Sequence, residues 1–370
     1  QTKLLMNKKN NRITVKDVAR MAGVSTAAAG RALGGYGYVS EELREKIIRA
    51  AEELGYVANQ VARAMITGKS QTIGVVGADI SNPFFAEALR GISDIARRHE
   101  FGVLITSSDE DVPREQEAVR ILLEKQVDGL IVSPADINNC HHLDQAIAQG
   151  IPVVLLDRKL PTLAADAVLI DNVHASREAT RYLLSCGHRR IAIITELSSD
   201  YDTQLALEPE KFSTINADRL NSSGARLLGY LLAHHEAGVA VEKTLIRRTG
   251  KYCAQHAFEE TLAVLDAAAP TAVFAVDNVM TQGAWRAVRE RGIAVPQKLS
   301  FFAFDELDWL TLTTPRISTV AQPIHHMGVH AAELLFRRIR ETDLPVSWQT
   351  YQVEMKLRES VATIAENVKG

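Results

Sequence analysis

Apolar residues are spaced in two different ways along this 370-residue chain, and the change falls near residue 70. Between Val15 and Leu54 they recur at the three- and four-residue intervals that are typical of amphipathic helices. After Ser70 they gather into short runs separated by helical segments. This pattern predicts a small helical unit followed by a much larger unit of alternating strands and helices.

The stretch from Ile13 to Leu33, ITVKDVARMAGVSTAAAGRAL, predicts two short helices joined by a tight turn. Gly23 should end the first helix, Val15 to Ala22, because glycine enters the left-handed conformation of a helix cap without steric cost. Ser25 is a favourable N-cap for the second helix. Small alanine side chains let that second helix cross closely over the first, as in a helix-turn-helix.

The outer face of the second helix carries Thr26, Ala27, Gly30 and Arg31. A helix pair with a purely structural role would show the same spacing, and charge favours a DNA-binding role instead. Residues 1–70 hold 12 Lys and Arg against 6 Asp and Glu, whereas residues 71–370 hold 30 against 39. The net charge of −3 is therefore the sum of a basic unit suited to DNA phosphates and an acidic unit that DNA repels.

The larger unit contains eight strand-like runs, at residues 72–77, 101–106, 129–132, 153–156, 167–170, 191–195, 272–276 and 299–303. Their alternation with helices predicts doubly wound parallel sheets. The length of this unit favours two lobes over a single sheet. We expect the chain to cross between the lobes near residues 162–165 with the following strand, after Thr195, and around residues 315–323.

Polar side chains follow several of these runs, at the strand ends where open parallel sheets bind ligands. Carboxylates and amides exchange hydrogen bonds with hydroxyl groups, arginine bridges several of them, and aromatic rings cover the apolar face of a sugar. The candidate ligand-binding residues are Asp79, Asn82, Phe84, Phe85, Asp109, Ser133, Arg158, Asn172, Arg226, Asp277, Asn278, Asp305 and Gln322.

Two segments, TVKDVARMAGVS and VSEELREKIIRAAEELGYVANQVARAMITGKSQTIGVV, resemble the bacterial lactose repressor family, and the resemblance extends along nearly the whole chain. It implies a helix-turn-helix DNA-binding head at residues 1–58 with a third helix from about Ser40 to Leu54. It further implies a hinge helix and linker at residues 59–70. Residues 71–370 then form an effector-binding and dimerisation domain of two lobes, similar to type I periplasmic sugar-binding proteins.

The resemblance also implies which residues contact DNA. The residues that match the base-reading positions are Thr26, Ala27, Gly30 and Arg31. Two of these four lack a hydrogen-bonding side chain, so we expect few direct hydrogen bonds to bases. The other DNA-binding candidates are Thr14, Ser25 and Tyr56 in the head, and Asn59, Ala62 and Met65 in the hinge. Met65 stands where the family usually has a leucine that wedges a minor-groove base step apart. The glycine-rich loop at residues 34–38 either brings Tyr36 or Tyr38 to the phosphates or is a flexible turn.

In the larger domain, Arg226 of the segment ARLLGY matches the arginine that commonly binds the effector in this family. Phe84, Arg158, Asn172, and Asp277 or Asn278 match further pocket positions. The chain departs from the family pattern in two places. Asp277-Asn278 reverses the usual Asn-Asp order, and residues 198–224 form a long polar insertion. A lid or partner site and a solvated insertion are both open interpretations of that segment, and the second is the simpler.

Other chemistry is weakly indicated. Cys140, Cys186 and Cys253 have no paired spacing, which fits a reducing cytoplasm, and the histidines at 325, 326 and 330 lack a companion ligand. We expect no metal and no cofactor. The sequence contains no signal peptide, no membrane-spanning run and no catalytic motif, so we expect a cytoplasmic protein that is not an enzyme.

Two functional classes remain. The first is a homodimeric transcription regulator, most often a repressor in this family, which binds double-stranded operator DNA and senses a small molecule such as a sugar or sugar derivative. The second is a sugar-binding protein or sugar-handling enzyme with the same two-lobed fold. The basic helix-turn-helix favours the first class. The tail from Ser360 to Gly370 has too few leucines for a tetramerising coiled coil, which favours a dimer.

Overall fold

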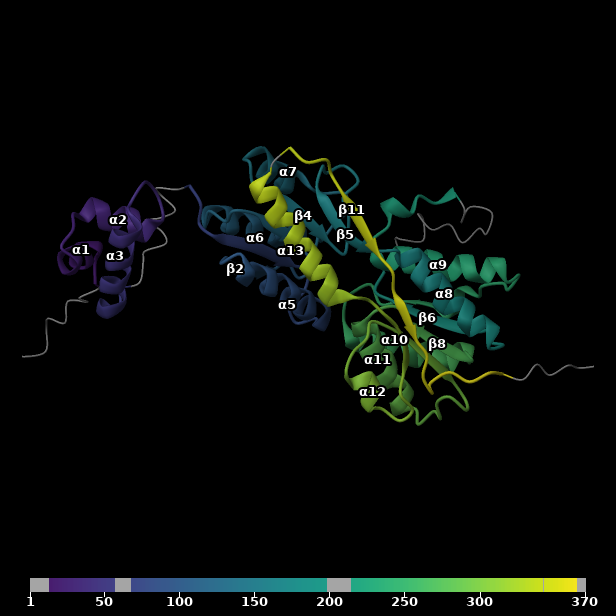
Figure 1. Ribbon diagram of the computed structural model, residues 1–370. Helices are drawn as coiled ribbons and strands as arrows, with labels where there is room; N and C mark the ends of the chain where they lie inside the picture. The colour runs from purple at the N-terminus through teal and green to yellow at the C-terminus, as the bar shows by residue number, and fades with distance from the viewer. Residues whose placement is uncertain (1–12, 57–67, 198–213, 342, 365–370) are drawn as a thin grey trace, which may run out of the picture. The chain divides into compact units, whose positions relative to one another are not determined.

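The computed structural model describes residues 13–56, 68–197, 214–341 and 343–364. The chain separates into two compact units, Gln1–Gln71 and Thr72–Gly370, each with its own hydrophobic core. The first unit is all-helical, and the second contains two six-stranded sheets. The predicted fold class is therefore confirmed (Figure 1).

The first unit consists of α1 (Val15–Ala22), α2 (Thr26–Gly34) and α3 (Glu41–Leu54). Gly23 caps α1 in the left-handed conformation with φ of 64°, as its lack of a Cβ predicts. The Ser25 side chain caps α2 by accepting a hydrogen bond from the Ala28 amide. The three helices enclose a core of Val18, Ala19, Ala22, Ala29, Ala32, Val39, Ile47, Ala50 and Ala51.

The first lobe of the larger unit is a parallel sheet with strand order β11-β5-β4-β3-β1-β2. Its strands are β1 (Thr72–Gly77), β2 (Gly102–Ser107), β3 (Leu130–Val132), β4 (Val153–Leu156), β5 (Asp166–Ile170) and β11 (Trp348–Tyr351). Helices α5 (Pro83–Arg98) and α13 (Ile324–Arg340) share one hydrophobic cluster with the sheet, and α6 (Val112–Glu124) and α7 (His141–Ala148) share another.

The second lobe has strand order β12-β10-β9-β8-β6-β7, parallel except for the antiparallel pair of β10 and β12. Its strands are β6 (Ile191–Thr195), β7 (Ile246–Arg248), β8 (Ala272–Ala275), β9 (Ser300–Phe304), β10 (Ser318–Ala321) and β12 (Glu354–Lys356). Its helices are α8 (Asn172–Ser185), α9 (Ser222–Glu236), α10 (Ala254–Ala268), α11 (Asn278–Glu290) and the short α12 (Trp309–Leu312). Two 3-10 turns, η3 (Ala217–Arg219) and η4 (Lys243–Leu245), precede α9 and β7.

Within the described residues the chain passes between the lobes three times: between β5 and α8, between β10 and α13, and between β11 and β12. The crossing expected after Thr195 is wrong, because β6 and β7 pair within one sheet. The third crossing follows the edge strand β11, whose side chains are mostly exposed and which therefore shows no apolar run in the sequence. Figure 1 shows α13 lying along the first lobe before the chain returns to the second.

Helices α5 and α13 pack against each other with backbone in direct contact, because glycines face each other at the crossing. A Cβ added at Gly328 would overlap the carbonyl oxygen of Ala88, and one added at Gly91 would overlap that of His325. Neither overlap can be relieved by rotating a side chain, because the overlapping atoms belong to the backbone. This close contact fixes α13, the element that follows the second crossing.

We predict that Gly328→Ala lowers the free energy of unfolding by about 1–3 kcal/mol, as overpacking of a core contact does, despite the higher helix propensity of alanine. Chemical denaturation of the full chain measures the change. Gly77→Ala is the matched control, because its Cβ would lie an ordinary 3.6 Å from Ile80 and Phe85. Equal stability of the Gly328 variant and the parent would contradict the close-packing argument.

Candidate functional site

The helix-turn-helix presents the four predicted base-reading residues on one side of α2. Thr26, Ala27 and Arg31 are exposed and Gly30 is half-buried. The opposite side of α2 carries Ala29 and Ala32, which are buried against the other two helices. A face with a single charged side chain and two small residues is therefore free for a partner.

The remaining DNA-binding candidates in the head have local structural contacts. Thr14 donates hydrogen bonds from its backbone N and from Oγ1 to the Asp17 carboxylate, which fixes the start of α1. Ser25 is exposed at the N-cap of α2, and Tyr56 is half-buried against the core of the head. Asn59, Ala62 and Met65 lie outside the described residues.

In the larger unit, side chains from both lobes enclose a small cavity of about 40 Å³. Eight predicted ligand-binding residues line it: Asn82, Phe84, Phe85, Arg158, Arg226, Asp277, Asp305 and Gln322. Six further lining residues are absent from the predicted set: Glu110, Asp157, Glu196, Ser222, Ser223 and Tyr252. We call this cavity the cleft.

Hydrogen bonds across the cleft join the lobes. Asn82, the N-cap of α5 in the first lobe, donates from Nδ2 to the Tyr252 hydroxyl of the second lobe at 2.7 Å. Asn278 at the start of α11 donates from Nδ2 back to Asn82 Oδ1. Asn278 thus bridges the lobes but does not line the cavity. On the other side of the cleft, Ser222 donates to Asp157 at 3.3 Å.

Arg226 is held rigidly at the cleft on α9. Its Nε donates to Asn172 Oδ1 at 2.8 Å, and its Nη1 donates to the carbonyl oxygen of Val276 at 2.6 Å. The guanidinium carbon lies 3.8 Å from the ring centre of Phe304. Arg226 is only 4% exposed, so the insertion before it does not displace it to the surface.

Arg158 and Glu110 form a two-pronged ion pair, with Nη1 and Nη2 each within 2.7 Å of a carboxylate oxygen. Arg158 Nη1 also donates to the carbonyl oxygen of Pro134 at 2.8 Å. Burial lowers the pKa of the Arg158 guanidinium, but Glu110 and Asp157 outweigh this effect and raise the pKa above its ordinary value. The charge of Arg158 is therefore already largely compensated within the protein.

Burial has a strong effect on the acidic groups of the cleft. It raises the pKa of the Asp277 carboxyl well above its ordinary value, and the nearby Glu196 raises it further. It also raises the pKa of Asp305, whose Oδ1 accepts a hydrogen bond from Gln322 Nε2 at 2.6 Å. Burial, together with Asp277 and Asp305, raises the pKa of the Tyr252 phenol. Shifted pKa values of this kind are often found at functional sites.

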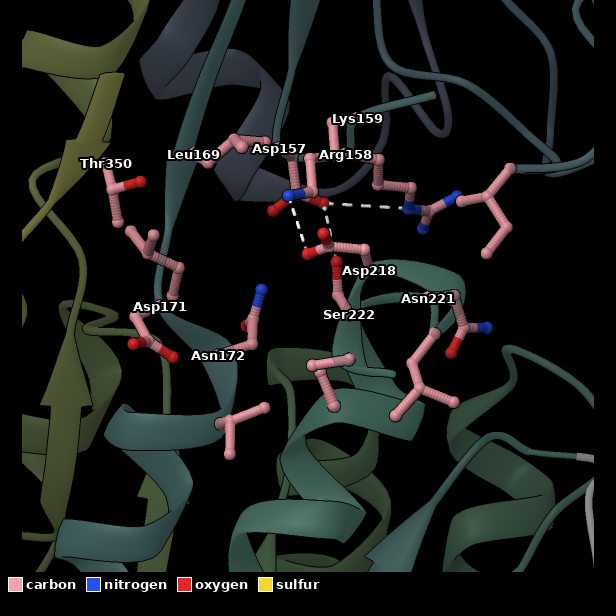
Figure 2. A pocket seen from close by; sticks show the side chains of 16 residues that line it. Asp157, Arg158, Lys159, Leu169, Asp171, Asn172, Asp218, Asn221, Ser222 and Thr350 are labelled. Atoms are coloured by element: carbon pink, nitrogen blue, oxygen red, sulfur yellow. Dashed lines mark hydrogen bonds and ion pairs between the residues drawn. The ribbon is translucent and has the colours of Figure 1, made fainter. Parts of the chain in front are cut away.

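A larger cavity of about 380 Å³ adjoins the cleft and shares Asp157, Arg158 and Ser222 with it. Figure 2 shows Asn172 pointing into this space between the loop after β4 and the start of α9. Lys159 of the first lobe and Asp218 of the second form an ion pair of 2.6 Å at its margin. Residues 217–222, from the end of the insertion, contribute to its wall. These residues are exposed or half-exposed as well as lining this cavity, so the two interpretations of the segment both remain open.

Five predicted ligand-binding residues are not part of the cleft lining: Asn172 and Asn278, described above, and Asp79, Asp109 and Ser133. Asp79 is engaged in its own turn, where its Oδ1 accepts hydrogen bonds from the Ser81 amide and hydroxyl. Asp109 is exposed and pairs with Arg114. Ser133 lines a separate apolar cavity of about 90 Å³, and its Oγ is buried without a hydrogen-bond partner.

Some of the lining residues absent from the predicted set carry a sequence signal, and others do not. Asp157 and Glu196 directly follow strands β4 and β6, the same signal that identified the other candidates. Tyr252 lies in the loop between β7 and α10, and no local pattern distinguishes it from other loop tyrosines.

The described residues contain no group of three side chains able to hold a metal ion. His325 Nε2 lies 3.4 Å from Asp94, and His330 Nδ1 lies 3.1 Å from the Tyr351 hydroxyl, so each has a single polar partner there. Among the helices of the described segments, none is long and apolar enough to cross a membrane.

Comparison with known proteins identifies two domain models in the chain. Residues 14–59 match the model of bacterial regulatory proteins of the lacI family, and residues 180–361 match a periplasmic binding protein-like domain. The first match covers the three helices of the head, and the second covers most of the second lobe and the return to the first.

Similar proteins align along nearly the whole chain. The HTH-type transcriptional regulator DegA of Bacillus subtilis is 33% identical over 85% of this chain and 88% of its own length. The ribose operon repressor of Haemophilus influenzae is 30% identical over 95% of this chain and 99% of its own length. The solved complex of the transcriptional regulator CelR with cellobiose superimposes with a TM-score of 0.66 at 26% identity, covering 94% of this chain and all of that chain. With a helix-turn-helix head, a two-lobed domain and full-length relatives that regulate transcription, the chain belongs to the LacI family of bacterial regulatory proteins.

Proposed function

We propose that this DNA-binding regulator is a homodimeric repressor whose head binds operator DNA and whose cleft binds a small hydroxylated effector, a sugar or sugar derivative. The observation that carries the proposal is the convergence of buried polar side chains from both lobes on one cleft. A ribose operon repressor and a regulator in complex with cellobiose among the similar proteins support a sugar as the class of ligand.

The functions proposed for the parts of the chain follow its division into segments. Residues 1–58 form the DNA-binding head, residues 59–70 the hinge and linker, and residues 71–370 the effector-binding and dimerisation domain. The compact units meet at residues 71 and 72, which is consistent with a linker that ends there. The basic head and the acidic remainder support the same assignment, since only the head attracts phosphate.

In the head, the second helix would enter the major groove of DNA with its exposed side. Arg31 carries the only charged group on that side and could donate two hydrogen bonds to a guanine. Ala27 could contact a thymine methyl group, and Thr26 offers a hydroxyl to a base or phosphate. Thr14, Ser25 and Tyr56 are proposed as backbone-positioning contacts, and Asn59, Ala62 and Met65 as minor-groove contacts of the hinge.

In the cleft, Asp277, Asp305 and Gln322 offer oxygen atoms to ligand hydroxyls, and Arg226 offers donors from a rigid position. Phe84 and Phe85 supply aromatic surface next to these polar groups. A ligand entering the cleft must replace some hydrogen bonds that join the lobes, such as that of Asn82 with Tyr252. Ligand binding is thereby coupled to the arrangement of the lobes, and through it to the anchors of the two hinges in a dimer.

Replacing Arg31 with alanine should weaken binding to the preferred operator by about 1–3 kcal/mol and flatten the preference at one base pair, since a bidentate contact to guanine is lost. Selection of binding sites from random DNA measures this preference. Arg20→Ala is the matched control, because Arg20 is an exposed arginine of α1 and should affect all sequences equally. An unchanged base preference in the Arg31 variant would refute its proposed role.

Replacing Arg226 with alanine should weaken effector binding by about 1.5–3 kcal/mol, the range of a charged hydrogen bond, and leave operator binding intact. The result would be a regulator that binds DNA but no longer responds to its ligand. Calorimetry with a series of mono- and disaccharides that includes ribose and cellobiose measures the affinity.

Arg177→Ala serves as the control for this experiment, because Arg177 forms only a surface ion pair with Glu236. Thermal denaturation reports any loss of folding, which Arg226→Ala is expected to cause in part by leaving Asn172 and Val276 without their donor. Equal sugar affinity in a folded Arg226 variant and in the parent would remove Arg226 from the binding site.

A further inference from the structure

The cleft has more carboxyl groups than guanidinium groups. Five carboxylates line it against two guanidinium groups: Glu110, Asp157, Glu196, Asp277 and Asp305 against Arg158 and Arg226. A neutral sugar needs no such excess, because its hydroxyl groups both donate and accept hydrogen bonds. Buried carboxylates are costly to keep unless a partner balances them.

Both arginines already have partners within the protein, although Arg226 keeps further N–H groups beyond its two hydrogen bonds. Arg158 is paired with Glu110 and the carbonyl oxygen of Pro134. Arg226 donates to Asn172 and Val276 and stacks on Phe304. An anionic ligand such as a sugar phosphate would therefore have to break existing pairs and would lie beside the carboxyl groups of the cleft.

The buried polar atoms without a partner in the cleft are mostly acceptors. Asp277 Oδ2, Gln322 Oε1 and Asp157 Oδ1 have no hydrogen-bond donor. The Asp277 and Gln322 residues are only 4% and 7% exposed. Arg158 Nε is the one buried donor without a hydrogen bond among the described cleft residues, and it faces Asp157 Oδ2 at 3.7 Å. The buried acceptor atoms of the cleft that lack a hydrogen-bond donor therefore favour a ligand that donates hydrogen bonds and carries positive charge.

We propose that the effector is a hydroxylated amine, such as an amino sugar, whose protonated amino group is held by Asp277, Gln322 and Asp157. An ammonium group has three N–H donors and no acceptor, so it can supply hydrogen bonds to acceptors of the cleft that have no donor within the protein. The 40 Å³ cleft is large enough for such a head group, and the adjoining 380 Å³ cavity has room for the rest of the molecule. This inference rests on the proposed function of the cleft as the effector site.

Calorimetry on the full-length protein tests the proposal with matched sets of ligands: glucosamine, N-acetylglucosamine and glucose, and the corresponding galactose and mannose compounds. N-acetylation keeps the nitrogen but removes its charge. In the best-binding set, the amine should bind at least about tenfold more tightly than both neutral members, because charge-assisted hydrogen bonds are roughly twice as strong as neutral ones.

The variant Asp277→Asn should abolish most of this preference for the amine. Asparagine caps a helix as well as aspartate does, so the hydrogen bonds of Asp277 Oδ1 to the amides of Val279 and Met280 can persist. Asp111→Asn is the matched control, because Asp111 also caps a helix, α6, and lies outside the cleft lining. The control should retain the preference of the parent.

The pH dependence provides a second readout. Burial raises the pKa of Asp277, so at pH values between its ordinary and raised pKa the empty cleft holds a proton that a bound cation displaces. Over this range the affinity for an amine should increase with pH and binding should release protons, whereas the affinity for a neutral sugar should not increase. The other charged groups facing Asp277 are Glu196, Asp305 and Arg226.

Neutral members that bind as tightly as the amines, or a series in which no amine binds, would overturn the inference. Tight binding of a neutral sugar that alters operator binding would leave the proposed function standing. The proposed function itself fails only if no hydroxylated compound of either kind, with ribose and cellobiose included, binds the cleft.

A separate observation concerns the head. The loop after α2 folds back so that the Tyr36 ring covers Gly34, where a Cβ would overlap the ring. A Cβ on Gly30 would lie 3.4 Å from the Tyr36 hydroxyl oxygen. On the other side of the loop, Gly37 lies against the aliphatic part of Arg31. The Tyr36 hydroxyl therefore lies next to the place where a side chain of residue 30 would begin on α2.

We infer that Tyr36 reads a base through this hydroxyl in place of residue 30. A hydroxyl both donates and accepts, so it can contact a base edge in the major groove. Tyr36→Phe removes only the hydroxyl and should reduce the preference at one base pair, distinct from that of Arg31, by about three- to tenfold in a binding-site selection. Tyr38→Phe in the same loop, where Tyr38 is 90% exposed, is the control. An unchanged preference, or a uniform loss of affinity for all sequences, would refute base reading by Tyr36.

Discussion

Asn82 donates a hydrogen bond to Tyr252 and accepts one from Asn278, and these bonds connect two lobes that have separate sheets. They lie at the strand ends, where the starts of helices bring polar side chains of the two lobes together. A buried hydrogen bond contributes only about 0.5–1.5 kcal/mol net, yet leaving its partners unpaired costs more. Ligand and protein groups can therefore exchange with small net changes in free energy. Under the proposed function, this near-balance would let a small molecule shift the arrangement of the lobes.

The described part of the insertion adds a chain-specific feature to this junction. Asp218 lies just before α9 and pairs with Lys159 of the opposite lobe, and both residues line the larger cavity. The pair is half-exposed and contributes little to stability by itself, because water screens it. Its position matters more than its energy, since a ligand that fills the larger cavity must come close to this ion pair. The described end of the insertion thus contributes to the larger cavity between the lobes.

Features encoded by neighbouring residues were predictable from the sequence. The Gly23 and Ser25 caps, the start of α3 after Ser40, and most central strands depend on local conformation and on continuous apolar runs. Strand β11 was not predictable, because its pairing with β5 joins residues far apart in the sequence and its own side chains are exposed. Most of the cleft followed from the rule that polar residues after parallel strands converge. Tyr252 did not, since it reaches the cleft from a loop.

Asp277 and Asp305 illustrate how the requirements of the proposed ligand site oppose those of stability. Their raised pKa values mean that the folded protein holds protons more tightly than the unfolded chain, so these carboxyls reduce stability as the pH rises above the ordinary pKa of aspartate. Hydrophobic residues of similar size would avoid this cost. A ligand that pairs with the carboxylates recovers the lost free energy on binding and stabilises the arrangement of the lobes that it requires. Under the proposed function, the destabilised cleft would be part of the free energy that couples ligand binding to lobe arrangement.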